Sequence, residues 1–96
     1  MVTSSGGSRQ RRLVRNPAFA RDIDKIRQSS ERAAEAVAAF ERIVVQIPEQ
    51  GMAVPGSPGF RSFPFHTDQG SYLAIYTFNA QEVVCLAVRP VRSGAF

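Results

Sequence analysis

GFRSFPFHTDQGSYLAIYTFNAQEVVCLAVRPVR, residues 59–92, is the stretch of the sequence that decides the fold. It contains three runs rich in aromatic and β-branched residues, at 60–65, 71–78 and 83–89. Polar residues typical of tight turns separate the runs, at 68–70 and 79–81. Because such short turns join antiparallel neighbours, the stretch predicts a three-strand antiparallel meander.

Two features of these runs predict where each strand lies in the sheet. Pro64, in the first run, lacks the N–H group that a central strand donates to its neighbour, so we expect this strand at an edge or distorted at its end. The third run, Val83 to Arg89, is apolar at odd and even positions alike. Strands buried on both faces have this pattern, so the run predicts a central strand that is covered on both sides.

Two helices are expected before the sheet. Asn16 and Pro17 are residue types preferred at the cap and the first position of a helix, and Ser30 is a suitable cap for a second one. Apolar residues then recur at helical spacing: Phe19, Ile23 and Ile26 in the first helix, and Ala33, Val37, Phe40, Val44 and Ile47 in the second. Pro48 is expected to end the second helix.

The remaining segments complete a predicted α+β fold. Residues 12–15 are expected to form a short N-terminal edge strand, and residues 50–59, rich in Gly and Pro, a loop from helix to sheet. The Ser- and Gly-rich residues 1–8 are expected to be a disordered tail, which leaves 9–96 as a single domain. The sequence thus predicts two N-terminal helices packed on a small antiparallel sheet, formed by the three-strand C-terminal meander and the short first strand.

Composition narrows the classes of partner. The chain has 96 residues and a net charge of +4, and Lys25 is the one lysine among twelve basic residues. Arginine binds phosphate and carboxylate in a bidentate way, which favours RNA, DNA or an acidic protein as partner, although a GC-rich coding sequence also enriches arginine. Without a long apolar run, a signal peptide or a second cysteine to pair with Cys85, the sequence predicts a cytoplasmic protein.

The order of segments and several short motifs resemble the RelE/ParE superfamily of toxins from bacterial type II toxin–antitoxin systems. The motifs are Gly59-Phe60-Arg61, Tyr72-Leu73-Ala74-Ile75-Tyr76, the turn 79–82, the strand 83–88 and the tail Arg89-Pro90-Val91-Arg92. The resemblance covers about Arg12 to Arg92. It implies that the first strand pairs antiparallel with the strand at 60–65. It also implies a cognate antitoxin, a possible homodimer or hetero-oligomer with that antitoxin, and DNA gyrase or ribosome-bound mRNA as the target.

The sequence departs from the ribonuclease members of this superfamily. An arginine usual in the third strand falls on Leu73, and a tail position often held by histidine falls near Val91. These departures slightly favour growth inhibition by binding gyrase over cleavage of mRNA. We keep as alternatives a ribosome-dependent endoribonuclease and a non-toxic binding module of the same fold.

The candidate site residues follow from the chemistry of RNA cleavage, which needs cations on the phosphate, a base and an acid. Arg61, Arg89 and Arg92 are the candidate cations, and His66 is the tentative catalytic group because histidine is the side chain best suited to proton transfer near neutral pH. For binding a target the candidates are Arg61, Tyr72, Arg89 and Arg92. We expect Arg61 and Arg89 on one open face of the sheet. Cys85 is expected in the core, and no residues suggest a metal or cofactor site.

Overall fold

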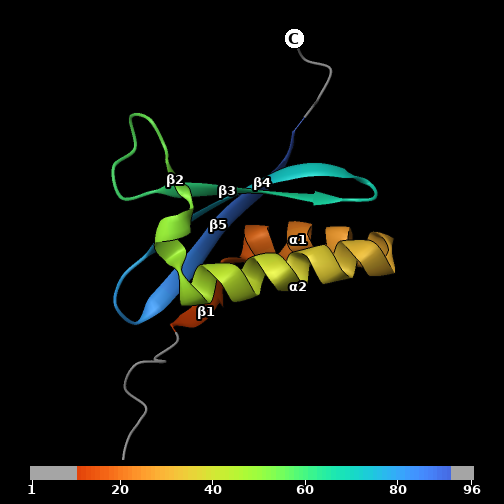
Figure 1. Ribbon diagram of the computed structural model, residues 1–96, viewed down its shortest axis with the longest axis horizontal. Helices are drawn as coiled ribbons and strands as arrows, with labels where there is room; N and C mark the ends of the chain where they lie inside the picture. Colours follow the sequence, from red (N-terminus) through yellow and green to blue (C-terminus); the bar gives the residue numbers. More distant parts are fainter. Residues whose placement is uncertain (1–10, 92–96) are drawn as a thin grey trace, which may run out of the picture.

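The computed structural model describes residues 11–91, which form two helices on one face of a five-stranded sheet (Figure 1). The elements in chain order are β1 (Arg12–Arg15), α1 (Pro17–Ser29), α2 (Glu31–Gln46), the 3-10 helix η2 (Pro48–Gln50), β2 (Met52–Ala53), β3 (Arg61–Thr67), β4 (Gly70–Phe78) and β5 (Glu82–Val91). The strand order across the sheet is β1-β5-β4-β3-β2. The predicted α+β class, with two helices packed on a small sheet, is confirmed. The expected tail 1–8 lies outside the described residues.

Side-chain caps start both helices, as the sequence predicts. The Asn16 side chain accepts a hydrogen bond from the Phe19 N–H at 2.8 Å, and Ser30 Oγ accepts one from the Ala33 N–H at 3.0 Å. Caps of this kind stabilise a helix by about 1 kcal/mol each. Ser30 has an extended backbone, with φ −169° and ψ 166°, so it separates α1 from α2. The two helices therefore pack side by side instead of forming one bent rod.

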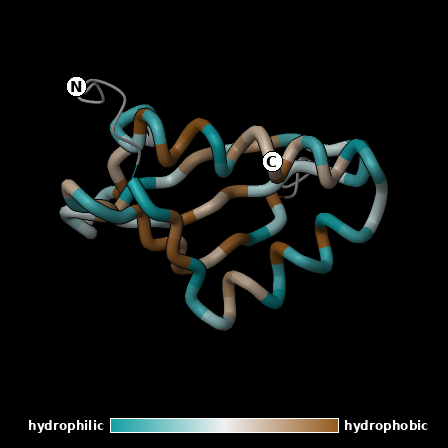
Figure 2. The backbone as a smooth tube through the Cα atoms, turned by 90° about the horizontal axis from the view of Figure 1, so that it is seen from below, coloured by the Kyte–Doolittle hydropathy of each residue, from teal (hydrophilic) through white to brown (hydrophobic). Residues whose placement is uncertain are grey.

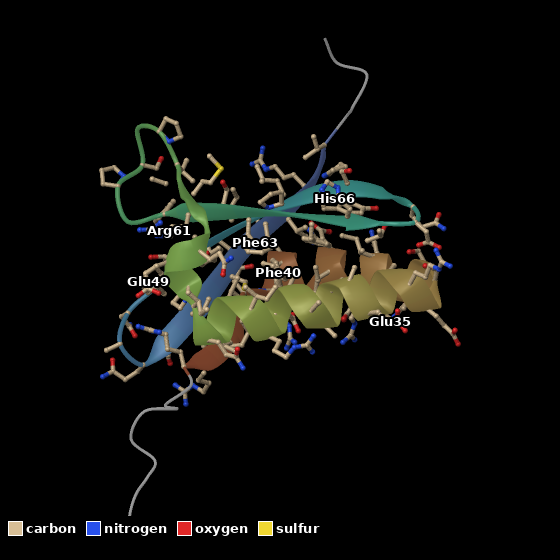
Figure 3. All side chains as sticks on the ribbon, in the orientation of Figure 1. Glu35, Phe40, Glu49, Arg61, Phe63 and His66 are labelled. Carbon is tan, nitrogen blue, oxygen red and sulfur yellow. The ribbon has the colours of Figure 1, made fainter. Side chains whose placement is uncertain are left out.

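The core lies between the helices and the sheet. Phe40 of α2 is at its centre, with ring centroids 5.6 Å from Phe63 and 5.2 Å from Phe65, and Figure 3 shows Phe40 and Phe63 facing one another across this layer. Hydrophobic and hydrophilic residues alternate along both helices and strands (Figure 2), so one face of each element is buried. Ile47, expected on the buried face of α2, is instead 52% exposed because the helix ends one residue earlier.

The pairing of the first strand differs from the expectation. β1 pairs in parallel with β5, from Arg12 opposite Glu82 to Arg15 opposite Cys85, and not antiparallel with β3. The sheet is therefore mixed. Two physical reasons favour this arrangement: the apolar run of β5 gains a neighbour on each side, and Pro64 leaves the outer edge of β3 without a full set of donors. β3 is the second strand of the sheet and not its edge, because the two-residue β2 pairs with Arg61 and Ser62 on its outer side; Pro64 lies beyond this short pairing.

The expectation that the third strand is covered on both sides is wrong. In β5 the buried residues are Val83, Cys85 and Val88, and those left partly exposed are Val84, Leu86 and Ala87. Both helices lie on one face of the sheet, so within residues 11–91 no helix covers the other face. The register shifts between Ile75, which faces Ala87, and Tyr76, which faces Cys85, and Leu86 is the extra residue of this bulge.

Candidate functional site

The face of the sheet away from the helices, called the open face below, can be assigned from the register. Ala74 and Tyr76 are fully buried under the helices, so the residues that alternate with them, Leu73 and Ile75, face the other way. Their cross-strand partners share that face. Together with these partners, the open-face residues are Arg12 and Val14 of β1, Met52 of β2, Ser62, Pro64 and His66 of β3, Ser71, Leu73, Ile75 and Thr77 of β4, and Glu82, Val84, Ala87, Arg89 and Val91 of β5.

The open face has apolar side chains exposed beside polar ones. Met52 is 68% exposed and Val91 is 45% exposed, while Leu73 and Ile75 are half-buried between them. Soluble proteins seldom expose a contiguous apolar patch without a binding role. The open face is therefore the strongest candidate for a binding surface in the described part of the chain.

Two arginines lie on the described open face: Arg12, which is paired with Glu82, and Arg89. Arg89 lies opposite Leu73 in the register, with apolar residues on either side. Within residues 11–91 no carboxylate forms an ion pair with Arg89. Glu82 is the one acidic residue in the described strands, and it is paired with Arg12. Arg89 is thus available to a partner's carboxylate or phosphate.

Arg61 lies on the opposite face, so the expectation that it shares the open face with Arg89 is wrong. Arg61 pairs with the buried Tyr76, which places its side chain on the helix side. There Arg61 Nη1 donates to the Gly51 carbonyl at 2.7 Å and to the Glu49 carbonyl at 3.3 Å. Its guanidinium also lies 5.8 Å from the centre of the Phe78 ring. These contacts hold the η2–β2 segment against the sheet (Figure 3).

Tyr72 is also on the helix side. Its ring stacks on that of Phe65, with centroids 5.6 Å apart, and it packs against the core. Tyr72 is therefore partly buried in a structural contact. Of the candidate target-binding residues, only Arg89 lies on the open face; Arg92 lies outside the described residues.

His66 does share the open face with Arg89. Its Nδ1 is 2.8 Å from the hydroxyl oxygen of Ser71, the residue opposite it on β4. Arg89 is opposite Leu73, two residues farther along β4. His66 and Arg89 thus come from the strands on either side of β4, and Figure 3 shows His66 on the side of the sheet away from the helices. The structure thus places these two residues on one face, with β4 between their strands, and Arg61 on the other face.

The hydroxyl of Tyr76 is a structural feature that the sequence does not reveal. It donates to the Pro48 carbonyl at 2.6 Å and accepts from the Gly51 N–H at 3.1 Å, and the side chain is fully buried. Burial raises the pKa of this hydroxyl above its ordinary value. A Cβ at Gly51 would collide with the Tyr76 hydroxyl, so a residue without a side chain is needed there. The feature of the sequence that points to this contact is Gly51, which directly follows η2.

Cys85 lies in the core, as expected, with no exposed surface. Burial raises the pKa of its thiol to about 12. A thiol of this kind stays protonated at neutral pH and is a poor nucleophile. Cys85 therefore contributes packing and no chemistry.

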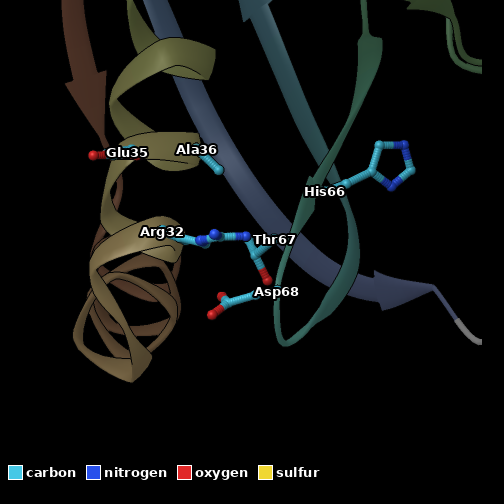
Figure 4. A pocket seen from close by; sticks show the side chains of 6 residues that line it. All are labelled: Arg32, Glu35, Ala36, His66, Thr67 and Asp68. Carbon is cyan, nitrogen blue, oxygen red and sulfur yellow. The ribbon is translucent and has the colours of Figure 1, made fainter.

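An open cleft of about 710 Å³ lies between α2 and the end of β3. It is lined by Arg32, Glu35, Ala36, His66, Thr67 and Asp68. In Figure 4 the Arg32 side chain extends from α2 toward β3, while the His66 ring lies on the opposite side of β3. The Asp68 carboxylate accepts a hydrogen bond from Ser30 Oγ at 2.6 Å. With cationic and anionic groups side by side, the cleft has no clear preference for an anion.

The described residues offer few groups for catalysis. Within residues 11–91 there is no cluster of His, Cys, Asp and Glu suited to a metal ion. No described helix has the length and apolar character needed to cross a membrane. On the described open face, Arg89 lies beside the apolar Leu73 and Ala87, His66 contacts Ser71, and Arg12 is paired with Glu82. This arrangement suits binding of a protein better than it suits acid–base chemistry on a phosphate.

Comparison with known proteins supports the fold. No protein-family model matches the chain, and no curated protein matches it. Among solved structures, a chain of the "Chromosomal ParDE TA system from P. aeruginosa" matches with a TM-score of 0.62 and 20% sequence identity. The match covers 85% of this chain and 97% of that chain. The chain therefore shares its fold with a component of a ParDE system, as the resemblance to the RelE/ParE superfamily implies.

Proposed function

We propose that this chain is the toxin of a type II toxin–antitoxin module and inhibits growth by binding an essential target. The fold shared with a chain of a ParDE system supports this proposal. The cognate antitoxin is the partner that neutralises the chain, and DNA gyrase is the favoured target.

The observation that carries binding over cleavage is the separation of the candidate nuclease residues. Arg61 donates to two backbone carbonyls on the helix side, on the face opposite to His66 and Arg89. Cleavage of RNA requires a base, an acid and cations around one phosphate. The described open face offers Arg89 and His66 within an apolar surface, which favours protein binding.

The endoribonuclease remains the second candidate because His66 and Arg89 share one face of the sheet. In that mechanism His66 would exchange the proton and Arg89, with Arg92, would neutralise the phosphate. A non-toxic binding module of the same fold is the third candidate, and the apolar open face suits it as well.

Induced expression of the chain alone in a bacterium separates these functions. Growth is followed together with mRNA integrity and plasmid supercoiling. We expect growth arrest with intact mRNA and disturbed supercoiling. Fragmented mRNA with defined cleavage ends would instead favour the ribonuclease. Normal growth with soluble, folded protein would contradict the toxin function and favour the binding module.

A further inference from the structure

The loop that joins β2 to β3 projects from one end of the sheet (Figure 1). Residues 52–60, with the sequence MAVPGSPGF, are called the hairpin tip below. Met52 is 68% exposed and Phe60 is 41% exposed. A side chain at Gly56 or Gly59 would meet open space, with no described atom within 4 Å of its Cβ. Large apolar side chains held in water on a projecting loop are typical of a contact with another molecule.

Two consecutive tight turns hold the hairpin tip in one shape. The Ser57 N–H donates to the Val54 carbonyl at 3.1 Å, and the Phe60 N–H donates to the Ser57 carbonyl at 3.1 Å. The second residue of each turn is proline and the third is glycine, with φ of +78° at Gly56 and +89° at Gly59. This combination is characteristic of type II turns. A tip built in this way loses little conformational freedom when it binds.

Hydrogen bonds behind the turns fix the hairpin tip to the sheet. The Val54 N–H donates to the Phe60 carbonyl at 3.2 Å and so continues the pairing of β2 with β3. The Thr77 hydroxyl of β4 donates to the Gly59 carbonyl at 2.8 Å. The position of Phe60 is therefore set by two neighbouring strands as well as by its own turn.

The two exposed apolar side chains of the tip act together. Met52 lies opposite Ser62, and Phe60 comes two residues before Ser62 in the same extended run. Because side chains alternate between the two faces of a strand, Met52 and Phe60 lie on one face of the hairpin. An aromatic ring with a flexible thioether beside it is a combination that often dominates the binding energy of a protein interface.

We propose that the hairpin tip inserts into an uncharged, apolar pocket of the essential target protein, with Phe60 as the central contact and Met52 beside it. The identification of the pocket's owner as the growth-essential target rests on the proposed function. The shape of the tip and the chemistry of the pocket rest on the residues of the tip itself.

The absence of charge on the tip selects the kind of pocket. Residues 50–60 contain no acidic or basic side chain. Arg61, the next cation along the chain, donates to the Gly51 and Glu49 carbonyls on the helix side. A charged groove would gain no ion pair from the tip and would lose hydration of its own charges. A nucleic acid is bound chiefly through phosphates, which need cations that the tip does not supply.

The test is the growth arrest caused by the full-length chain when it is expressed alone. Its potency is the intracellular concentration of chain that halves the growth rate, read by quantitative immunoblot. Phe60→Ser should raise that concentration about tenfold or more, because a central interface contact is lost. Met52→Ser should raise it less. Phe60→Leu, which keeps an apolar side chain, should retain most of the potency. Circular dichroism of each purified variant establishes that it is folded.

Matched controls separate the tip from general effects of substitution. Ile47, at the end of α2, is 52% exposed and lies outside the tip, so Ile47→Ser removes a comparable apolar side chain and should leave potency unchanged. Gly56→Ala strains the first turn without adding a contact and should reduce potency about threefold or more. Gly70→Ala makes the same change in the β3–β4 turn, where φ is +149°, and should act as the native chain does.

Phe60→Arg distinguishes a protein pocket from a nucleic acid. A cation in an apolar pocket is desolvated without a partner, so this variant should be less potent than Phe60→Ser. Potency equal to or above that of the native chain would overturn the pocket and favour a phosphate-bearing target.

Two further results would overturn the proposal: folded Phe60→Ser as potent as the native chain, or an equal loss in Ile47→Ser. These results are distinct from failure of the toxin function. Growth arrest that survives Phe60→Ser would refute only the role of the tip. A native chain that causes no arrest at any concentration would refute the toxin function, and the assignment of the tip to an essential target with it.

Discussion

Tyr76 illustrates how one buried polar group fixes a connection between layers. Its hydroxyl joins the Pro48 carbonyl and the Gly51 N–H, so the segment after α2 is tied to the middle of β4. Arg61 reinforces the same segment through the Glu49 and Gly51 carbonyls. Arg61, a candidate functional residue in the sequence, is thus part of the structural support of this segment.

Tyr76→Phe is expected to lower the free energy of unfolding by about 1–3 kcal/mol, because it leaves two buried backbone groups without a partner. Urea denaturation measures the change. Gly51→Ala should also destabilise the protein, since its new Cβ meets the Tyr76 hydroxyl. The double variant should lose less than the sum of the two single losses, because removing the hydroxyl relieves part of the collision. Strictly additive losses would contradict this contact.

The buried thiol of Cys85 predicts a stability that falls at alkaline pH. The native pKa is raised by burial from 9.0 to about 12, whereas the unfolded thiol ionises near its ordinary value. The contribution of Cys85 to stability is therefore complete below pH 9 and decreases as the pH rises toward 12. In urea denaturation between pH 7.5 and 10.5, the stability difference between the native chain and Cys85→Ala should shrink with pH. A difference that stays constant with pH would refute the raised pKa of the Cys85 thiol.

At the level of elements, the sequence predicts helix caps and turns well and predicts strand pairing poorly. The caps Asn16 and Ser30 and the turn at 68–70 act through neighbouring residues, so the sequence identifies them. The parallel pairing of β1 depends on contacts about 70 residues apart, which no local pattern encodes. The face of Arg61 depends likewise on register, so its separation from Arg89 was visible only in the structure.

The cap at Ser30 links two elements and gives a further prediction. Ser30 Oγ accepts from the Ala33 N–H at the start of α2 and donates to Asp68 in the β3–β4 turn. Ser30→Ala should lower the free energy of unfolding by about 1 kcal/mol, while Ser30→Asn should keep most of the cap. Thermal or urea denaturation of both variants is the measurement. Equal losses in the two would mean that the cap contributes little.

For the whole molecule, Arg89 and Arg92 provide a test of the proposed function. Arg89→Ala combined with Arg92→Ala should remove growth inhibition, because the target would lose its cationic contacts, while the fold remains intact. Growth curves after induction and circular dichroism of the purified variant measure the two effects. Lys25→Ala is the control and should remain inhibitory. A folded double variant that still arrests growth would contradict the assignment of Arg89 and Arg92 to the target-binding site.

The central position of β5 has a consequence for synthesis of the chain. β5 is the last described strand in the sequence, yet it lies between β1 and β4 and supplies the buried Val83, Cys85 and Val88. On the ribosome, β1 has no neighbour and the core is incomplete until β5 has emerged, because translation proceeds from the N-terminus. A nascent chain ending at Phe78 should lack cooperative unfolding by circular dichroism. A growth-inhibiting surface built on this sheet would therefore come into existence only as translation finishes, which leaves a partner little time to act before the first active molecule.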